Sequence, residues 1–370
     1  MSTRGALPRL AMVSWGHDWL TRREAPHGEY RVPQVLDELC ERGYNALRVD
    51  AFPHLLATGS DGVHSERFQL LGHGNLWLAP RKQLLDLATQ ARSRNLRLWL
   101  TSRFLNDTQA RRAFVRRPRD FVDVWSQTLQ LLAEHQLLDT VAAVDFCDEF
   151  TSPETTHGAW RSLFPRHPLN PLSRLMDWSA ESEQAVERYL LDVPRALRAL
   201  FPTIAFGVSV STQTEARLRK LDTSELDFID THFWLDDDPR IGLMTGAPLA
   251  MTGNRLARAV QTQLAGLAWR TRGVAWVRQL EDRFDTLSEF ARLRRLQPVV
   301  GGGYVRVASE AAADWRWVQD VSEAMINTAL GHGVSCMITA QQARPQSQPL
   351  WREIDWHRDM THRILTGPGR

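Results

Sequence analysis

The feature that most constrains the fold is a regular alternation of short apolar segments with amphipathic segments along the whole chain. Eight apolar runs rich in β-branched and aromatic residues predict strands, and helical spacing of apolar residues follows these runs. In the first helical stretch Val32, Val35, Leu36 and Leu39 recur at i, i+3, i+4 and i+7, before Gly43. Strict alternation of strand and helix predicts a parallel sheet.

The number of units points to a closed sheet. The expected strands lie at about residues 10–15, 44–52, 96–103, 141–149, 203–211, 227–234, 298–306 and 334–339. Eight units in 370 residues favour a barrel over a doubly wound sheet, since no Gly-x-Gly-x-x-Gly follows the first strand. We therefore predict an α/β fold, a single (β/α)8 TIM barrel over residues 1–370, with long loops after strands 2 and 4. Residues 254–296 predict one long helix, or two with a break at Gly273.

Composition narrows the classes of function. The 45 basic and 43 acidic side chains form no long run of either sign, so nothing predicts a nucleic-acid or membrane partner. Cys40, Cys147 and Cys336 are scattered and odd in number, which predicts a reducing compartment without disulfides. No apolar leader or 18-residue apolar run occurs, so we expect a cytoplasmic protein.

No motif for a cofactor or metal is present. The chain lacks a phosphate loop and a Gly-x-Ser-x-Gly elbow, so we expect no nucleotide cofactor and no serine-hydrolase chemistry. His54, His64 and His73 share one loop, but their spacings match no zinc signature. We predict that they are solvated and that no metal is bound.

The expected strand at 141–149 carries the strongest candidate for an active site. Its apolar residues lead into the adjacent pair Asp148 and Glu149. Ionised carboxylates are costly inside a strand, but the carboxyl end of a barrel strand is where such enzymes place catalytic groups. We predict Glu149 as a general acid and base, and Asp148 as a second catalytic candidate. The alternative for Glu149 is a helix-capping or salt-bridged residue.

Other strand ends would converge with Glu149 if the barrel closes. The residues that we assign to substrate binding are Arg48, Asp50, His232, Trp234, Trp15, Trp19, Trp99 and Arg103. Tryptophan faces stack on pyranose rings, and carboxylates bond hydroxyl groups and transfer protons, so this set predicts a carbohydrate site. The competing interpretations are core packing for each tryptophan, a structural ion pair for Arg48 and a hydrogen-bonded core residue for His232.

Three short motifs resemble a known group of enzymes. Gly43-Tyr-Asn-Ala-Leu-Arg48 is similar to the second-strand signature of glycoside hydrolase clan A, the family 5-like cellulase barrels. Asp148-Glu149 falls where that clan has Asn-Glu, and Asp227-Phe-Ile-Asp-Thr-His232-Phe-Trp234 resembles its sixth-strand pattern with Trp in place of Tyr. The longer run through His54 is most similar to the sugar-binding cellulase-like group. The resemblance implies a barrel, a carbohydrate substrate and an acid/base role for Glu149.

One departure from that clan leaves the mechanism open. The resemblance implies a nucleophilic Glu on strand seven, but Gly301-Gly302-Gly303 stands there. A retaining glycosidase needs two carboxyls about 5–5.5 Å apart, and an inverting one about 6.5–9.5 Å. Another carboxylate could substitute, with Asp50, Asp148 and Glu310 as candidates. Alternatively Asp148-Glu149 could act as in substrate-assisted hexosaminidases, the site could bind sugar without catalysis, or an engineered Glu→Gly change could be present.

We therefore expect a glycoside hydrolase that cleaves a bond in a small oligosaccharide or glycoside, with Glu149 as acid/base. The alternatives are a catalytically silent carbohydrate-binding barrel and a hexosaminidase-type enzyme. The sequence leaves the sugar, the linkage, the stereochemical outcome and the oligomeric state open.

Overall fold

The computed structural model describes residues 7–21, 31–58, 65–72, 76–164, 178–237, 239–246, 255–305, 315–345 and 347–367. Its strands are β1 (Leu10–Gly16), β2 (Ala46–Asp50), β3 (Phe68–Gln69), β4 (Trp77–Leu78), β5 (Arg97–Thr101), β6 (Val141–Asp145), β7 (Ala205–Ser211), β8 (Phe228–Trp234), β9 (Gln297–Val300), β10 (Gly303–Tyr304) and β11 (Cys336–Ile338). Its larger helices are α2 (Val32–Glu41), α4 (Pro80–Arg92), α5 (Pro118–Glu134), α7 (Ala180–Leu200), α11 (Arg255–Arg294), α12 (Arg316–Gly331) and α14 (Ile354–Thr366). Shorter ones are α1 (Asp18–Thr21), α3 (Pro53–Leu56), α6 (His157–Leu163), α8 (Thr212–Leu218), α9 (Pro239–Met244) and α13 (Gln348–Trp351).

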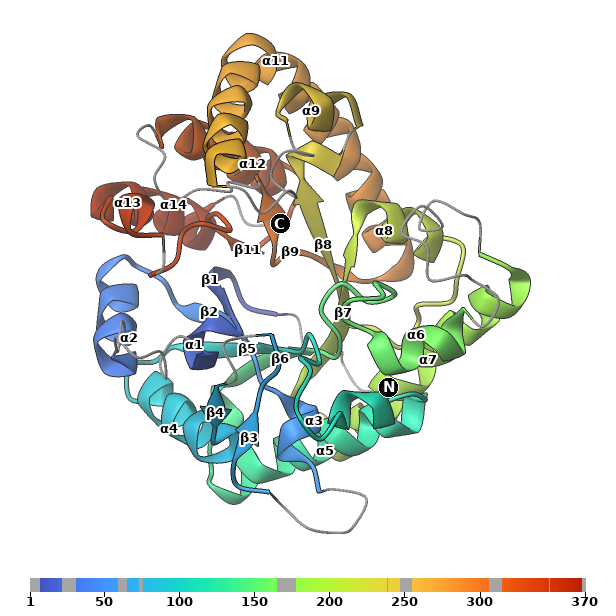
Figure 1. The fold of residues 1–370 in the computed structure, drawn as a ribbon. Coiled ribbons are helices and arrows are strands. Elements are labelled where there is room, and N and C mark those ends of the chain that lie inside the picture. Colours follow the sequence, from blue (N-terminus) through green and yellow to red (C-terminus); the bar gives the residue numbers. More distant parts are fainter. Residues whose placement is uncertain are drawn as a thin grey trace. The chain divides into compact units, whose positions relative to one another are not determined.

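The main sheet closes on itself. Its strand order is β10-β8-β7-β6-β5-β2-β1-β11-β9, and an additional pairing between β8 and β9 joins its ends. Because β9 and β10 are two segments of one strand position, the described residues form a barrel of eight parallel strands with helices between them (Figure 1). The predicted TIM barrel is confirmed.

The chain divides into two compact units, which are described separately below. The first unit contains Met1–Leu7, Trp15–Gln34 and Arg48–Ile229, and the second contains Pro8–Ser14, Val35–Leu47 and Asp230–Arg370. The single domain over residues 1–370 stays a prediction.

The fourth barrel strand, β6, is shorter than predicted. It ends at Asp145 rather than at Glu149, because backbone groups beyond it bond to other partners. The Cys147 N–H donates to the Asp145 carboxylate at 3.3 Å, and the Asp148 N–H donates to the Ser102 carbonyl at 2.8 Å. Asp148 and Glu149 therefore lie in a turn beyond the strand.

The long loop predicted after strand 2 contains structure of its own. Helix α3 is followed by the antiparallel pair β3–β4 within the described part of this segment. Leu70 forms an isolated antiparallel bridge with Asp107, so this hairpin packs against the segment that follows β5. The predicted helical region 254–296 is one helix, α11, which continues through Gly273.

Two residues of the second-strand motif are explained by contacts inside the second unit. Gly43 has a φ of +79°, and a Cβ there would lie 2.6 Å from the Thr361 Oγ1, so only glycine fits. The Asn45 side chain accepts the Ala11 N–H at 2.9 Å and donates to the Arg9 carbonyl at 2.9 Å. These bonds tie the segment before β2 to β1.

A buried hydrogen-bond chain also holds the second unit together. His357 Nε2 lies 3.0 Å from the Leu350 carbonyl, which can only accept, so this nitrogen carries the proton. Nδ1 therefore accepts from the Tyr44 hydroxyl at 2.7 Å, and that hydroxyl accepts from Thr339 at 2.5 Å. Burial lowers the pKa of His357 to about 3, so the imidazole stays neutral.

The helices surround the sheet, and their apolar sides face it. In α5, for example, Trp125 is fully buried and donates from Nε1 to the Phe146 carbonyl at 2.9 Å. Among the described helices, none combines the length and hydropathy needed to cross a membrane.

We expect Gly207→Ala to destabilise the fold, because β7 passes β8 very closely. A Cβ at Gly207 would lie 2.4 Å from the Phe228 carbonyl oxygen and 2.6 Å from its ring. The loss should be about 1–3 kcal/mol in chemical denaturation. The matched control is Gly331→Ala at the end of α12, where nothing lies within 4 Å and a gain of about 0.5–1 kcal/mol is expected. Equal effects of the two changes would contradict this account.

Candidate active site

The centre of the first unit is an ion pair between Arg48 and Asp145. Arg48 Nη2 lies 2.8 Å from the Asp145 Oδ2, and both side chains are buried. The same Oδ2 accepts hydrogen bonds from the Thr101 hydroxyl at 2.8 Å and the Ser209 hydroxyl at 2.7 Å, while Oδ1 accepts the Ser209 N–H at 2.9 Å. Because residues of β2, β5 and β7 all bond to this carboxylate of β6, it fixes the four strands at their carboxyl ends.

Asp148 lies between two arginines. Its Oδ1 is 2.6 Å from the Arg48 Nη2, and its Oδ2 is 3.5 Å from the Arg103 Nε. Asp148 is buried, whereas the Arg103 side chain is 40% exposed. Burial lowers the pKa of Arg103, but the carboxylates of Asp148, Glu149 and Asp50 outweigh burial and raise it. This arginine therefore stays charged beside the predicted catalytic pair.

Asp50 is a second buried carboxyl at the end of β2. Its Oδ1 accepts the Phe52 N–H at 2.8 Å, and its Oδ2 accepts the Arg103 N–H at 2.9 Å. Burial raises the pKa of Asp50 to about 6, the two backbone N–H groups oppose that rise, and the charge of Asp148 adds to it. This carboxyl can therefore change its protonation state near neutral pH.

Glu149 follows Asp148 in the turn beyond β6 and is half-buried. Its N–H donates to the Ser209 hydroxyl at 2.9 Å, and its carbonyl accepts from the Thr155 hydroxyl at 3.1 Å. Ser209 thus bonds to Asp145 with its hydroxyl proton and accepts from Glu149 with its oxygen. One side chain of β7 holds both the buried carboxylate and the backbone of the predicted acid/base.

Left-handed backbone conformations gather at the ends of these strands. Phe52, Phe104, Glu149 and Thr151 have φ values of 52°, 48°, 49° and 74°, after β2, β5 and β6. Such conformations cost of order 1–3 kcal/mol for non-glycine residues and cluster at functional sites. The other examples in this unit include Asn95 and Gln136, which simply end helices. The strained positions therefore lie at the carboxyl ends of β2, β5 and β6, where the sequence predicts the site.

The three tryptophans predicted near the site in this unit are buried. Trp15, Trp19 and Trp99 are each exposed by 1% or less. Trp19 Nε1 donates to the Asp50 carbonyl at 2.9 Å, and the Trp99 ring lies 4.5 Å from that of Phe228. The structure places their rings within the packed interior. Their role in sugar stacking stays a prediction.

His232 and Trp234 lie at the carboxyl end of β8, in the second unit. His232 is buried, its Nε2 lies 3.6 Å from the Asp230 Oδ2, and Trp234 is half-buried. The Gly301 N–H donates to the Asp230 Oδ1 at 2.6 Å. A Cβ at Gly302 would lie 2.8 Å from the His232 Nε2, so the imidazole fills the space that a side chain at 302 would need.

Gly303 is constrained by the backbone rather than by a side chain. Its φ is +119°, and a Cβ there would lie 2.4 Å from the Phe233 carbonyl oxygen. The close approach of β10 to β8 therefore explains why glycine stands at both 302 and 303. Glu310 lies outside the described residues.

Sequence reasoning missed the two residues that organise the first unit, Asp145 and Ser209. Asp145 directly follows the apolar residues of β6, and a carboxylate at the end of a predicted strand was the available signal. Ser209 alternates with buried valines in β7, so nothing in the sequence separates it from an ordinary strand serine. The structure brings Arg48, Asp50, Arg103, Asp148 and Glu149 together in this unit.

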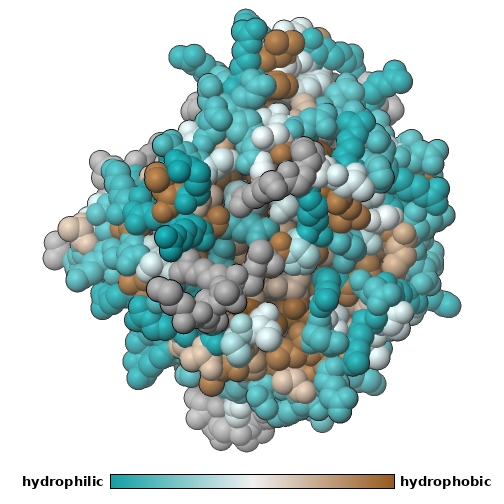
Figure 2. Space-filling view, turned by 180° about the vertical axis from the view of Figure 1, so that it is seen from behind, coloured by the Kyte–Doolittle hydropathy of each residue, from teal (hydrophilic) through white to brown (hydrophobic). Residues whose placement is uncertain are grey.

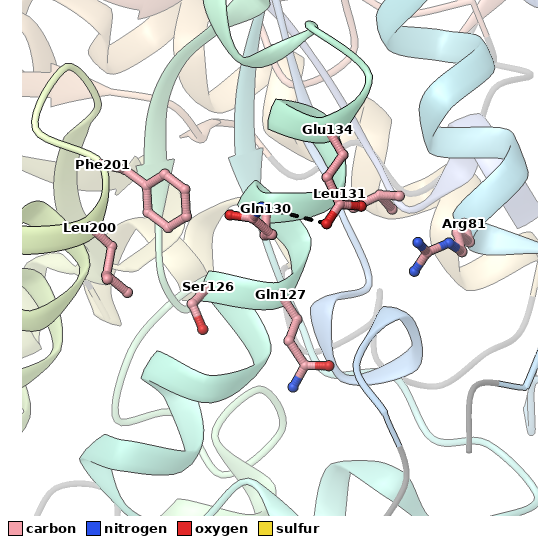
Figure 3. A pocket seen from close by; sticks show the side chains of 8 residues that line it. All are labelled: Arg81, Ser126, Gln127, Gln130, Leu131, Glu134, Leu200 and Phe201. Carbon is pink, nitrogen blue, oxygen red and sulfur yellow. Dashed lines mark hydrogen bonds between the residues drawn. The ribbon is translucent and has the colours of Figure 1, made fainter. Parts of the chain in front are cut away.

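One pocket of about 380 Å³ lies elsewhere in the first unit (Figure 3). Side chains of α4, α5 and the end of α7 line it, among them Arg81, Gln130 and Phe201. None of the predicted site residues lines it, so it does not bear on the chemistry at the strand ends.

Comparison with known proteins identifies the family. A family model described as sugar-binding cellulase-like matches residues 12–365. The chain belongs to this sugar-binding cellulase-like family. The resemblance inferred from the three motifs is therefore confirmed. No curated protein matches the sequence.

Solved structures share the cellulase-like barrel. A putative glycoside hydrolase from Parabacteroides distasonis ATCC 8503 is 24% identical, with a TM-score of 0.83 and coverage of 99% of this chain and 96% of that one. PbGH5A, a glycoside hydrolase family 5 enzyme from Prevotella bryantii B14 in complex with a xyloglucan tetradecasaccharide, is 13% identical, with a TM-score of 0.57 and coverage of 98% and 99%. At these identities the likeness shows the fold alone.

Histidines in the described part of this cellulase-like chain form no metal centre. Among the described residues, no group of three or more His, Cys, Asp or Glu side chains is placed to hold a metal ion. His54 is buried, with Nε2 2.9 Å from the Leu105 carbonyl, and burial lowers its pKa to about 3, so it is not solvated as predicted. His64 and His73 lie outside the described residues.

We expect Arg48→Met to destabilise the fold of this cellulase-like protein strongly, because it leaves Asp145 buried without its counter-charge and Asp148 paired only with Arg103 at 3.5 Å. Breaking a buried pair in this way costs about 3–5 kcal/mol. The matched control is Arg363→Met, whose exposed pair with Asp359 should contribute at most about 1 kcal/mol. Denaturant midpoints would measure both, and a loss for Arg48→Met no larger than the control would refute the central role of the pair.

Asp50 should make stability depend on pH. Its pKa is about 6 in the fold against an ordinary 3.8, so between these values the folded state retains a proton that the unfolded chain has lost. The contribution to stability is full below about pH 4 and is lost as pH rises through 6. We expect Asp50→Asn to remove this decline. Thermal unfolding of both proteins from pH 4 to 7 measures it, and parallel curves would contradict the raised pKa.

Proposed function

We propose that this protein is a glycoside hydrolase that cleaves a glycosidic bond in a small oligosaccharide or glycoside. Glu149 serves as the general acid that protonates the leaving oxygen while the C1–O bond breaks. Its carboxylate then takes a proton from the attacking water. Membership in the sugar-binding cellulase-like family supports the substrate class. The free cysteines are compatible with action in the cytoplasm.

The observation that carries this proposal is the difference in burial and pairing between two adjacent carboxylates, those of Asp148 and Glu149. Asp148 is buried and pairs with Arg48 at 2.6 Å, so its charge is already compensated. Glu149 is half-buried in a strained turn, and its carboxylate is close enough to raise the pKa of Arg103. A proton donor must reach the substrate, and only Glu149 of this pair combines exposure with a fixed backbone. Asp148 serves as a positioning residue that holds Arg103 beside it.

The proposal assigns no protein nucleophile to the segment 301–303. Glycines there are compatible with the contacts of Gly302 with His232 and of Gly303 with Phe233. Either a water molecule or a 2-acetamido group of the substrate would then attack C1. Both routes need Glu149 as the general acid. In the route through the 2-acetamido group it then acts as base when water attacks the intermediate, whereas direct attack by water needs a second carboxylate as the base.

A catalytically silent sugar-binding barrel is the second candidate. The same glycine run favours it, because catalysis without a second protein carboxylate depends on the substrate. In this case the group of Arg48, Asp50, Arg103 and Asp148 would only bond sugar hydroxyls. Calorimetry with oligosaccharides would then show saturable binding without any product.

We expect Glu149→Gln to abolish hydrolysis while leaving the fold intact. Loss of general acid catalysis should lower kcat by about 10²–10⁴-fold on an aryl glycoside or oligosaccharide that the wild type cleaves. Glu154→Gln is the matched control, an exposed glutamate in the next turn that accepts from the Ser152 hydroxyl. Its activity should equal that of the wild type.

Three outcomes separate the candidates. Equal turnover in Glu149→Gln and wild type would refute the assignment of the acid/base. Turnover confined to 2-acetamido sugars would identify the substrate-assisted route. Binding without turnover across a panel of aryl glycosides would establish the silent barrel instead.

A further inference from the structure

Side chains of three helices line a pocket of about 380 Å³ in the first unit, apart from the predicted site residues (Figure 3). Helix α5 supplies most of the floor, through Ser126, Gln127, Gln130, Leu131 and Glu134. Residues four apart share one side of a helix, so positions 126, 130 and 134, with 127 and 131 beside them, form one continuous surface. We call this cavity the α5 pocket.

The two sides of the α5 pocket differ in character. Arg81, in the first turn of α4, stands on one side, and Leu200 and Phe201, where α7 ends, stand on the other (Figure 3). Leu200 is exposed by 59%. Apolar patches interrupt the hydrophilic surface at several places in Figure 2, so an exposed leucine alone identifies no ligand. What identifies the ligand is the set of polar groups on α5.

Two glutamines of the floor are oriented by their neighbours. The Gln127 Oε1 accepts hydrogen bonds from the N–H and the hydroxyl of Thr58, both at 2.8 Å, which leaves its Nε2 to donate to a ligand. The Gln130 Nε2 donates to the Glu134 Oε1 at 3.4 Å, which leaves the Gln130 Oε1 to accept from a ligand. The floor therefore presents a donor and an acceptor whose orientations are set within the protein.

The described lining excludes several classes of ligand. One guanidinium, Arg81, and one carboxylate, Glu134, give it no net charge, so it does not suit a multiply charged anion such as a phosphate ester. It contains one carboxylate and no His or Cys, which are too few ligands for a metal ion. Its one aromatic side chain, Phe201, is only 7% exposed, so that ring offers no open face to a nucleobase.

A short uncharged saccharide suits this lining. Its hydroxyl groups both donate and accept hydrogen bonds, as the two glutamines require, and the C–H groups of its ring can pack against Leu200. A volume of about 380 Å³ falls within the range of about 300–1,000 Å³ that is usual for small-molecule sites. Membership in the sugar-binding cellulase-like family agrees with this class of ligand.

We propose that the α5 pocket binds a short uncharged saccharide, at a site separate from the strand ends. The pocket lies among the helices of the first unit, and none of its lining residues belongs to the predicted catalytic group. The inference therefore does not depend on the hydrolase activity proposed above.

Isothermal titration calorimetry of the full chain tests the proposal. A Glu149→Gln background prevents turnover, and the probes are cellobiose, mannobiose, xylobiose and chitobiose. We expect one of these disaccharides to occupy two sites per chain, and Ser126→Trp, which places an indole in the pocket, should remove one of them. The matched control is Thr89→Trp on α4, an exposed residue outside the pocket whose hydroxyl donates to the Leu85 carbonyl. It should keep both sites.

Gln130→Leu provides a second test that adds no bulk. Gln130 is exposed, so the change should leave the fold intact. It should raise the Kd of the pocket about threefold to tenfold, which corresponds to the loss of one hydrogen bond.

The outcomes decide between the pocket and its alternatives. Equal isotherms for Ser126→Trp and Thr89→Trp, an unchanged Kd in Gln130→Leu, or no saturable binding of any of the four disaccharides would overturn the proposal. Displacement of the disaccharide by inorganic phosphate or glycine would overturn it too, because it would indicate a site for charged ligands. A single site that Ser126→Trp removes would support the pocket and would contradict sugar binding at the strand ends.

Discussion

The interaction on which the first unit depends is the buried pair of Arg48 with Asp145 and Asp148. Two carboxylates share one guanidinium nitrogen at 2.8 and 2.6 Å, inside a sheet where each unpaired charge would cost several kcal/mol. Asp145 offsets this cost because it also accepts bonds from β5 and β7. A well-packed apolar core would be at least as stable, so stability alone does not account for the pair. What it provides is geometry, because it ties four strands together at the end where Glu149 lies.

Ser209 links the buried pair to the turn that contains Glu149. Its hydroxyl donates to Asp145 and accepts from the Glu149 N–H, so both ends of the turn after β6 are fixed to β7. Such anchoring explains how a non-glycine residue is held at a φ of 49°. Two hydrogen bonds that share Ser209 thus link the Glu149 backbone to Asp145.

Much of the fold followed from periodicity, and much of the site did not. The positions of the eight barrel strands were predictable, because each combines an apolar run with a helical stripe beyond it. The end of β6 was predicted four residues too far, since the Cys147 N–H donates to the Asp145 carboxylate there instead of to a neighbouring strand. Arg48 and Asp148 were found through motifs, whereas Asp145 and Ser209 act only through partners on other strands. A single sequence does not reveal such partners when the residue itself is common in strands.

In the second unit, the glycine run 301–303 on strand seven packs directly against the sixth-strand motif on β8. His232 on β8 fills the space beside Gly302, and Asp230 on the same strand accepts the Gly301 N–H. A carboxylate at 302 would therefore have to displace the imidazole, and one at 303 would meet the Phe233 carbonyl. Both positions are therefore closed by neighbours on β8, and the contacts of this chain fit glycine at 302 and 303.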